Sequence, residues 1–181
     1  MDFLAINKTL HIIAAIVGVL SATAEEILYF KDIKDGKIDE AEARQLRITY
    51  KLMHWCLIIL VLTGFGILAA VYLKYGGTKT FYSPVLWVKY LVVLVLLANA
   101  VLIAAKKISM KWASSISLTS WYFAYALGAL SGKIREIKFL VDFFSQFNFI
   151  IISFFLVIGY IAAIIIMVQI LEYIKKLMIK Q

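Results

Sequence analysis

Long apolar stretches separated by short polar segments are the main pattern along the chain. A helix that crosses a bilayer needs about 20 mostly apolar residues. By this measure the sequence predicts spans near residues 3–30, 50–74, 84–105, 112–131 and 140–173. The fourth is the least apolar, because its first half reads SSISLTSWYF, and the fifth is longer than a straight span requires. The pattern predicts an all-α integral membrane protein, a bundle of five transmembrane helices (a four-helix core plus one) in a single domain over residues 1–181.

Two local signals predict where helices begin. Pro84 suits the first turn of the third span, because the N–H that proline lacks would have no partner within the helix there. Asp39 follows the turn-forming pair Asp35-Gly36 and suits the N-cap of a second helix that starts before its span. The mixed charges around Asp39 are typical of a solvated surface.

Composition excludes several classes of protein. The chain is 64% hydrophobic and 17% charged, whereas soluble domains are about 45–50% apolar and about 25% charged. A soluble enzyme domain is therefore excluded, and one cysteine, Cys56, cannot build a disulfide scaffold. The chain has no GxGxxG, Walker, HExxH or CxxC motif, so nucleotide, zinc-protease and thiol-redox chemistry have no motif to support them.

Basic residues predict the orientation in the membrane. The net charge is +8, but the bases lie mostly between apolar stretches and no nucleic-acid motif is present, so nucleic acid is not an expected partner. With five spans, one side carries Lys31, Lys34, Lys37, Arg44, Arg47, Lys51, Lys106, Lys107, Lys111, Lys175, Lys176 and Lys180. The other side carries Lys8, Lys74, Lys79, Lys133, Arg135 and Lys138. The positive-inside rule therefore predicts an outside N-terminus and a cytoplasmic C-terminus, and the Lys- and Ile-rich composition suggests a prokaryotic inner or plasma membrane.

The first span carries a stripe of small and polar residues on one face. Steps of three and four from His11 give Ala14, Ala15, Gly18, Ser21, Ala22 and Glu25. The large residues Ile12, Ile13, Ile16, Val19 and Leu20 occupy the other faces and are expected to face lipid. Two uses of the stripe stay open. It can pack closely against another helix, or Ala15 and Gly18 can leave room for a flat porphyrin whose iron His11 binds.

Depth in the bilayer brings His11 and Lys89 together. At a rise of about 1.5 Å per residue, His11 lies about 12 Å and Lys89 about 6–8 Å below the outer ends of their spans. Both are thus expected in the outer leaflet. Lys89 either extends its ammonium to the headgroups or holds a porphyrin propionate, and if burial deprotonates it, it can serve as a catalytic base or ligand.

The second histidine is expected in the inner leaflet. His54 lies roughly level with Glu25 and Glu26, so a pair between His54 and either glutamate could form a polar clamp or proton relay. The depth difference disfavours one haem bound by both histidines, but a second haem at His54 stays open. Asn99, in the third span, is expected to make an interhelical hydrogen bond.

The first 105 residues resemble a known family. KTLHIIAAIVG, WCLIILVLTGFGIL and LWVKYLVVLVLL are similar to the first three helices of HemJ-type protoporphyrinogen oxidases and their CopD-like relatives. The resemblance implies a small membrane bundle that binds haem b, with the family's essential histidine at His11 and its lysine at Lys89. After Lys89 this chain has LLANAV where the family has a Tyr-His-Gly segment, so we carry over haem binding and leave the oxidase activity open.

These observations lead to two functional hypotheses. The first is a membrane protein that binds haem b or a related porphyrin for redox chemistry or electron transfer, with quinone or a respiratory-chain protein as its redox partner. The second is a non-enzymatic subunit of a larger complex, or a small transporter in which Glu25, Glu26, His54 and Asn99 form a proton or ion path. Either protein could form a homodimer through its small-residue and aromatic faces.

Overall fold

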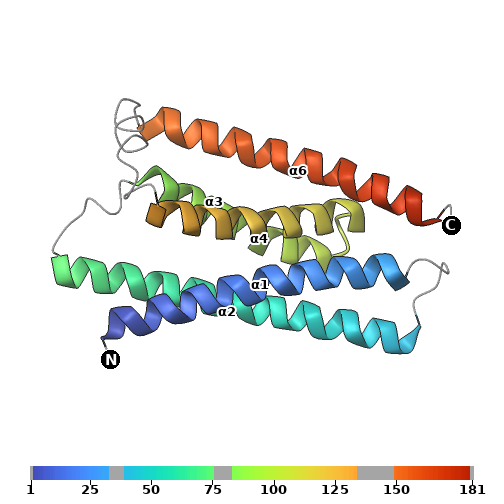
Figure 1. Cartoon of the computed structure of the whole chain (residues 1–181), viewed down its shortest axis with the longest axis horizontal. Coiled ribbons are helices and arrows are strands. Elements are labelled where there is room, and N and C mark those ends of the chain that lie inside the picture. Colours follow the sequence, from blue (N-terminus) through green and yellow to red (C-terminus); the bar gives the residue numbers. More distant parts are fainter. Residues whose placement is uncertain (1, 33–38, 76–82, 134–148, 180–181) are drawn as a thin grey trace. The chain divides into compact units, whose positions relative to one another are not determined.

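The computed structural model describes residues 2–32, 39–75, 83–133 and 149–179. Within these ranges the chain forms helices and no strand (Figure 1). The helices are α1 (Phe3–Asp32), α2 (Glu40–Tyr75), α3 (Pro84–Ala104), α4 (Met110–Lys133) and α6 (Phe149–Ile179). The predicted all-α fold class is confirmed.

Four of the described helices are long and apolar enough to cross a membrane. The qualifying segments are Phe3–Lys31, Glu40–Lys74, Pro84–Ala104 and Phe149–Met178. α4 corresponds to the fourth expected span and is helical, but it does not reach this level of apolarity, in keeping with its polar first half. Residues 140–148, where the fifth span was expected to begin, lie outside the described residues.

Both predicted helix starts are confirmed. At the start of α2, the Glu42 N–H donates to Asp39 Oδ1 at 2.8 Å, and Glu42 Oε2 accepts from the Asp39 N–H at 2.8 Å. This reciprocal capping box satisfies two backbone donors that the first turn of a helix leaves unpaired. α3 begins at Pro84 in the first helical position, after Ser83 in an extended conformation.

The turn between α3 and α4 is held by a helix-terminating motif. The Lys106 N–H donates to Ile103 O at 3.0 Å, and the Lys107 N–H donates to Leu102 O at 2.9 Å. This is the Schellman pattern, which requires a left-handed residue after the helix. Lys106 occupies that position with φ 54°, a conformation that usually favours glycine.

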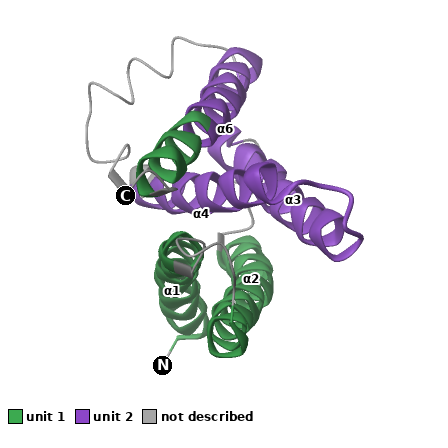
Figure 2. Cartoon of the chain, turned by 90° about the vertical axis from the view of Figure 1, so that its right-hand side faces the viewer, with its two compact units in different colours: residues 1–76, 169–181 green, residues 77–168 purple. Residues whose placement is uncertain are grey.

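The chain divides into two compact units, shown in different colours in Figure 2. The first comprises residues 1–76 with 169–181, and the second comprises residues 77–168. The first contains α1, α2 and the end of α6, and the second contains α3, α4 and the rest of α6. Each unit is described by itself below.

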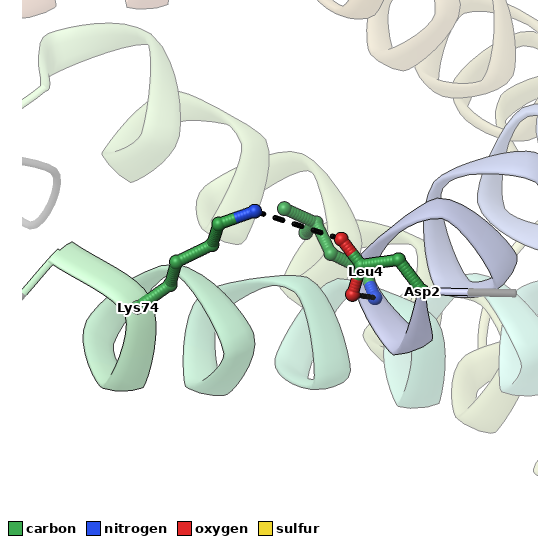
Figure 3. A network of polar contacts seen from close by, with 3 residues as sticks. All are labelled: Asp2, Leu4 and Lys74. Carbon is green, nitrogen blue, oxygen red and sulfur yellow. Dashed lines mark hydrogen bonds and ion pairs between the residues drawn. The ribbon is translucent and has the colours of Figure 1, made fainter.

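In the first unit, α1 and α2 form an antiparallel hairpin (Figure 1). Lys74 Nζ lies 3.6 Å from Asp2 Oδ2 (Figure 3), and His11 Nδ1 lies 3.0 Å from Thr63 Oγ1. Residues later in α1 therefore contact residues earlier in α2, as in an antiparallel pair. Asp2 Oδ1 also accepts from the Leu4 N–H at 3.4 Å, at the start of α1. The Asp2–Lys74 pair is exposed on both sides, and such pairs contribute at most about 1 kcal/mol.

The two faces of α1 differ as predicted. The small residues Ala14, Gly18, Ser21 and Ala22 are buried. The large residues Ile12, Ile13, Ile16 and Leu20 are exposed, and Val19 is half-buried. Among the buried residues of α2, Met53, Cys56, Leu57 and Leu60 have larger side chains than these small residues. By the register of the hairpin these residues lie level with the small residues of α1, so small side chains meet large ones.

The second unit has its own apolar core. Val88 and Val92 of α3, Leu127 of α4 and Tyr160 of α6 form a buried cluster. Further along the α3–α4 pair, Asn99 Nδ2 donates to Ala113 O at 2.8 Å. The expected interhelical hydrogen bond of Asn99 is confirmed.

Candidate functional site

His11 is held in a defined orientation by α2. Its Nδ1 lies 3.0 Å from Thr63 Oγ1, and Thr63 Oγ1 lies 2.6 Å from Ile59 O. A threonine hydroxyl has one proton, and the short contact to a carbonyl oxygen assigns that proton to Ile59 O. Thr63 Oγ1 therefore accepts from the His11 Nδ1–H. In neutral His11 this tautomer places the lone pair on Nε2, the nitrogen that would coordinate a metal.

Two glycines of α2 allow α1 to approach closely at this level. A Cβ added at Gly64 would lie 3.5 Å from His11 Cε1, and one added at Gly66 would lie 2.5 Å from Asn7 Oδ1. The Asn7 amide is itself fixed, because its Nδ2 donates to Phe3 O at 2.9 Å. Thr63, Gly64 and Gly66 therefore form the part of α2 that contacts His11 and Asn7 of α1.

Sequence reasoning did not identify Thr63, Gly64, Gly66 or Asn7 as parts of this site. Thr63 is 52 residues from His11 along the chain, and no local pattern links the two. The available signal was a hydroxyl followed by two small residues within an otherwise apolar span, which is typical of close helix contacts in membranes.

The small-residue stripe below His11 serves helix packing. Ala14 and Gly18 are buried, Ala15 is half-buried, and Leu60 and Leu57 of α2 are buried at the matching levels. Of the two uses left open by the sequence, close packing is therefore present. At this level of the hairpin, the group that could hold a porphyrin iron is the half-buried His11 imidazole, whose orientation Thr63 fixes.

The inner part of the hairpin carries the remaining ionisable residues. Glu26 is buried, with 8% of its surface exposed, and Glu25 is half-buried. His54 Nδ1 donates to Tyr50 O at 2.8 Å, and the two rings lie 4.1 Å apart between centroids. The hydrogen-bond partner of His54 in the described structure is thus Tyr50, and its predicted pairing with Glu25 or Glu26 stays a prediction.

Lys89 belongs to the second unit. It is half-buried on α3, next in sequence to Val88 of the apolar core. His11 belongs to the first unit, so the predicted proximity of Lys89 and His11 stays a prediction. No group of three or more His, Cys, Asp or Glu side chains suited to a metal ion occurs in the part of the chain that the structure describes.

Fold and site together define an all-α protein with membrane-length apolar helices and one oriented histidine between two of them. Comparison with known proteins adds no relative: no family model, curated protein or solved structure matches the chain.

Proposed function

We propose that this protein is an integral membrane protein that binds haem b, or a related porphyrin, through His11 for redox chemistry or electron transfer. The observation that carries the proposal is the hydrogen bond between His11 Nδ1 and Thr63 Oγ1. A histidine that ligates a metal almost always donates its other ring N–H to a nearby acceptor, which fixes the ring and raises the basicity of the coordinating nitrogen. Thr63 is such an acceptor.

Each residue has a distinct task in this proposal. His11 coordinates through Nε2, and Thr63 holds the tautomer and the ring plane. Lys89 offers a positive charge that suits an acidic group such as a propionate. Glu25, Glu26 and His54 accept and pass protons in the inner half of the hairpin. Bound haem supplies one-electron chemistry, and quinone or a respiratory-chain protein is the redox partner.

The alternative function is non-enzymatic. A subunit of a larger complex, or a small transporter with a proton path, would use the polar groups of the inner hairpin without any haem. The observation favouring it is that Glu26 is buried and belongs to a helix long and apolar enough to cross a membrane. Ionisable groups at such positions commonly mark ion or proton paths.

The proposed location is a prokaryotic inner or plasma membrane, with the N-terminus outside. The side of the C-terminus depends on α4, because five crossings place it in the cytoplasm and four place it outside. The two can be distinguished with a cysteine introduced near the C-terminus of a Cys56→Ala protein. A thiol reagent that does not cross the membrane, added to intact cells, labels this cysteine only if the C-terminus is outside. Labelling of a cytoplasmic control cysteine at Arg44 shows whether the cells are intact.

A reduced-minus-oxidised visible spectrum of the purified protein tests the haem proposal. With haem supplied during expression, we expect Soret and α bands in the wild type and in His54→Ala, and loss of both bands in His11→Ala. Thr63→Val, which keeps the shape of the side chain, should weaken haem binding about 10–100-fold. Circular dichroism and size-exclusion chromatography check that each variant folds.

Two results would contradict the proposal. The first is a folded wild-type protein without bands after haem supply. The second is a folded His11→Ala protein whose bands persist at full intensity. Partial loss of band intensity in each histidine variant would instead indicate two haems, one at His11 and one at His54.

A further inference from the structure

The polar side chains in the first half of α4 are buried. Ser115 and Ser120 have no exposed surface, and Ser117 and Thr119 are also buried. The hydroxyl groups of this segment therefore lie in the interior of the protein, where apolar side chains are usual. Inside a membrane protein such groups need hydrogen-bond partners, since lipid supplies none.

Part of this polar set forms a line along one face of α4. Residues 113, 117 and 120 share a face because they are spaced by four and three. At one end Asn99 of α3 donates from Nδ2 to Ala113 O at 2.8 Å. At the other end Ser120 Oγ is hydrogen-bonded to the hydroxyl of Tyr160 on α6, with the buried Ser117 between. Seven residues of helix separate the ends, which is about 10 Å. We call Asn99, Ser117, Ser120 and Tyr160 the polar seam.

One atom of the seam lacks a protein partner. Asn99 is 3% exposed, and its Oδ1 makes no hydrogen bond to any residue that the structure describes. The carbonyl of Ala113 points towards the C-terminus of α4, as helix carbonyls do, and therefore towards Ser117. The Asn99 side chain, which donates to this carbonyl, is thus expected on the side of Ala113 nearer to Ser117. Leaving a buried acceptor unpaired costs about 1–3 kcal/mol. A small hydrogen-bond donor beside Asn99 Oδ1 would remove that cost.

We propose that the polar seam binds water, as a short hydrogen-bonded chain running from Asn99 towards Tyr160 inside the second unit. Its groups are amide and hydroxyl, which are neutral. The Asn99 amide can both donate and accept, whereas Ser120 Oγ donates its one proton to Ile116 O and so offers only an acceptor. These neutral groups suit water better than an ion, which in a low-dielectric interior needs countercharge or a full ligand shell. Buried water in proteins typically makes about three hydrogen bonds, and the amide and hydroxyls of the seam can supply them. The seam is independent of haem at His11.

Cysteine accessibility in membranes tests the proposal. In a Cys56→Ala protein, Ser117→Cys is treated with a small, positively charged methanethiosulfonate, which reacts only with hydrated, ionised thiols. The matched control is Leu94→Cys, because the α3–α4 pairing places Leu94 at nearly the same depth and Leu94 is itself 65% exposed. Ser109→Cys, exposed in the turn before α4, is the positive control.

We expect Ser109→Cys and Ser117→Cys to react and Leu94→Cys not to react. Adding Asn99→Leu, which removes the unpaired acceptor, should slow the reaction of Ser117→Cys at least tenfold. An unreactive Ser117→Cys beside a reactive Ser109→Cys would overturn the proposal, as would equal reaction of Leu94→Cys and Ser117→Cys. Ser120→Cys, one turn further along the seam, decides in the same way if Ser117→Cys does not fold.

Discussion

The close approach of α1 to α2 can be tested at Gly66. A Cβ at this position would lie 2.5 Å from Asn7 Oδ1 and 2.9 Å from Asn7 Cγ, which is too close for either atom to stay in place. In Gly66→Ala the Asn7 side chain must therefore rotate and give up its hydrogen bond to Phe3 O. Gly64→Ala is the matched control, because its Cβ would lie 3.5 Å from His11 Cε1, an ordinary contact distance.

The size of the effect follows from two opposing contributions. Replacing glycine by alanine within a helix stabilises it by about 1 kcal/mol. Displacing Asn7 costs about 1 kcal/mol for the lost hydrogen bond, plus any residual steric cost. Gly66→Ala should therefore leave the free energy of unfolding unchanged or lower it, whereas Gly64→Ala should raise it by up to about 1 kcal/mol. In an Asn7→Ala background the clash is gone, and Gly66→Ala should stabilise the protein by about 1 kcal/mol.

A double-mutant cycle between Asn7→Ala and Gly66→Ala measures this difference. Unfolding in mixed detergent micelles, followed by circular dichroism, gives the four free energies. We expect a coupling of about 1 kcal/mol or more for Asn7 with Gly66, and additive effects for Asn7 with Gly64. A coupling below about 0.3 kcal/mol, the usual limit for independent sites, would refute the close approach at Gly66.

Three further predictions concern helix ends and the seam. Lys106→Gly should stabilise the protein by about 1 kcal/mol, because glycine adopts the left-handed conformation without strain; a lower thermal midpoint would contradict the Schellman turn. Asp39→Ala should destabilise it by about 1 kcal/mol through loss of the cap on Glu42, whereas Asp39→Asn should retain most of the stability. Tyr160→Phe should lower the free energy of unfolding by about 1 kcal/mol, and this loss should disappear in a Ser120→Ala background.

Local features of the structure could be predicted because they depend on neighbours in sequence. Long apolar runs gave the all-α class, since a backbone in lipid must satisfy its hydrogen bonds within its own helix. Asp39 and Pro84 marked helix starts through the geometry of a single turn. The exposed side of α1 followed from helical periodicity, which places Ile12 and Ile16 on the face away from Ala14.

The partners across helices were decided only by tertiary structure. Periodicity shows which face of a helix is buried, but it does not fix how far one helix slides along another. In the first unit that offset depends on fits such as Asn7 against Gly66, and it selects Thr63 as the residue that orients His11. In the second unit the packing of α4 against α3 and α6 buries the weakly apolar first half of α4 and brings its hydroxyl groups together with Asn99 and Tyr160 in the polar seam. The sequence by itself thus determined the helices and their faces, and the packing between helices determined which polar groups meet.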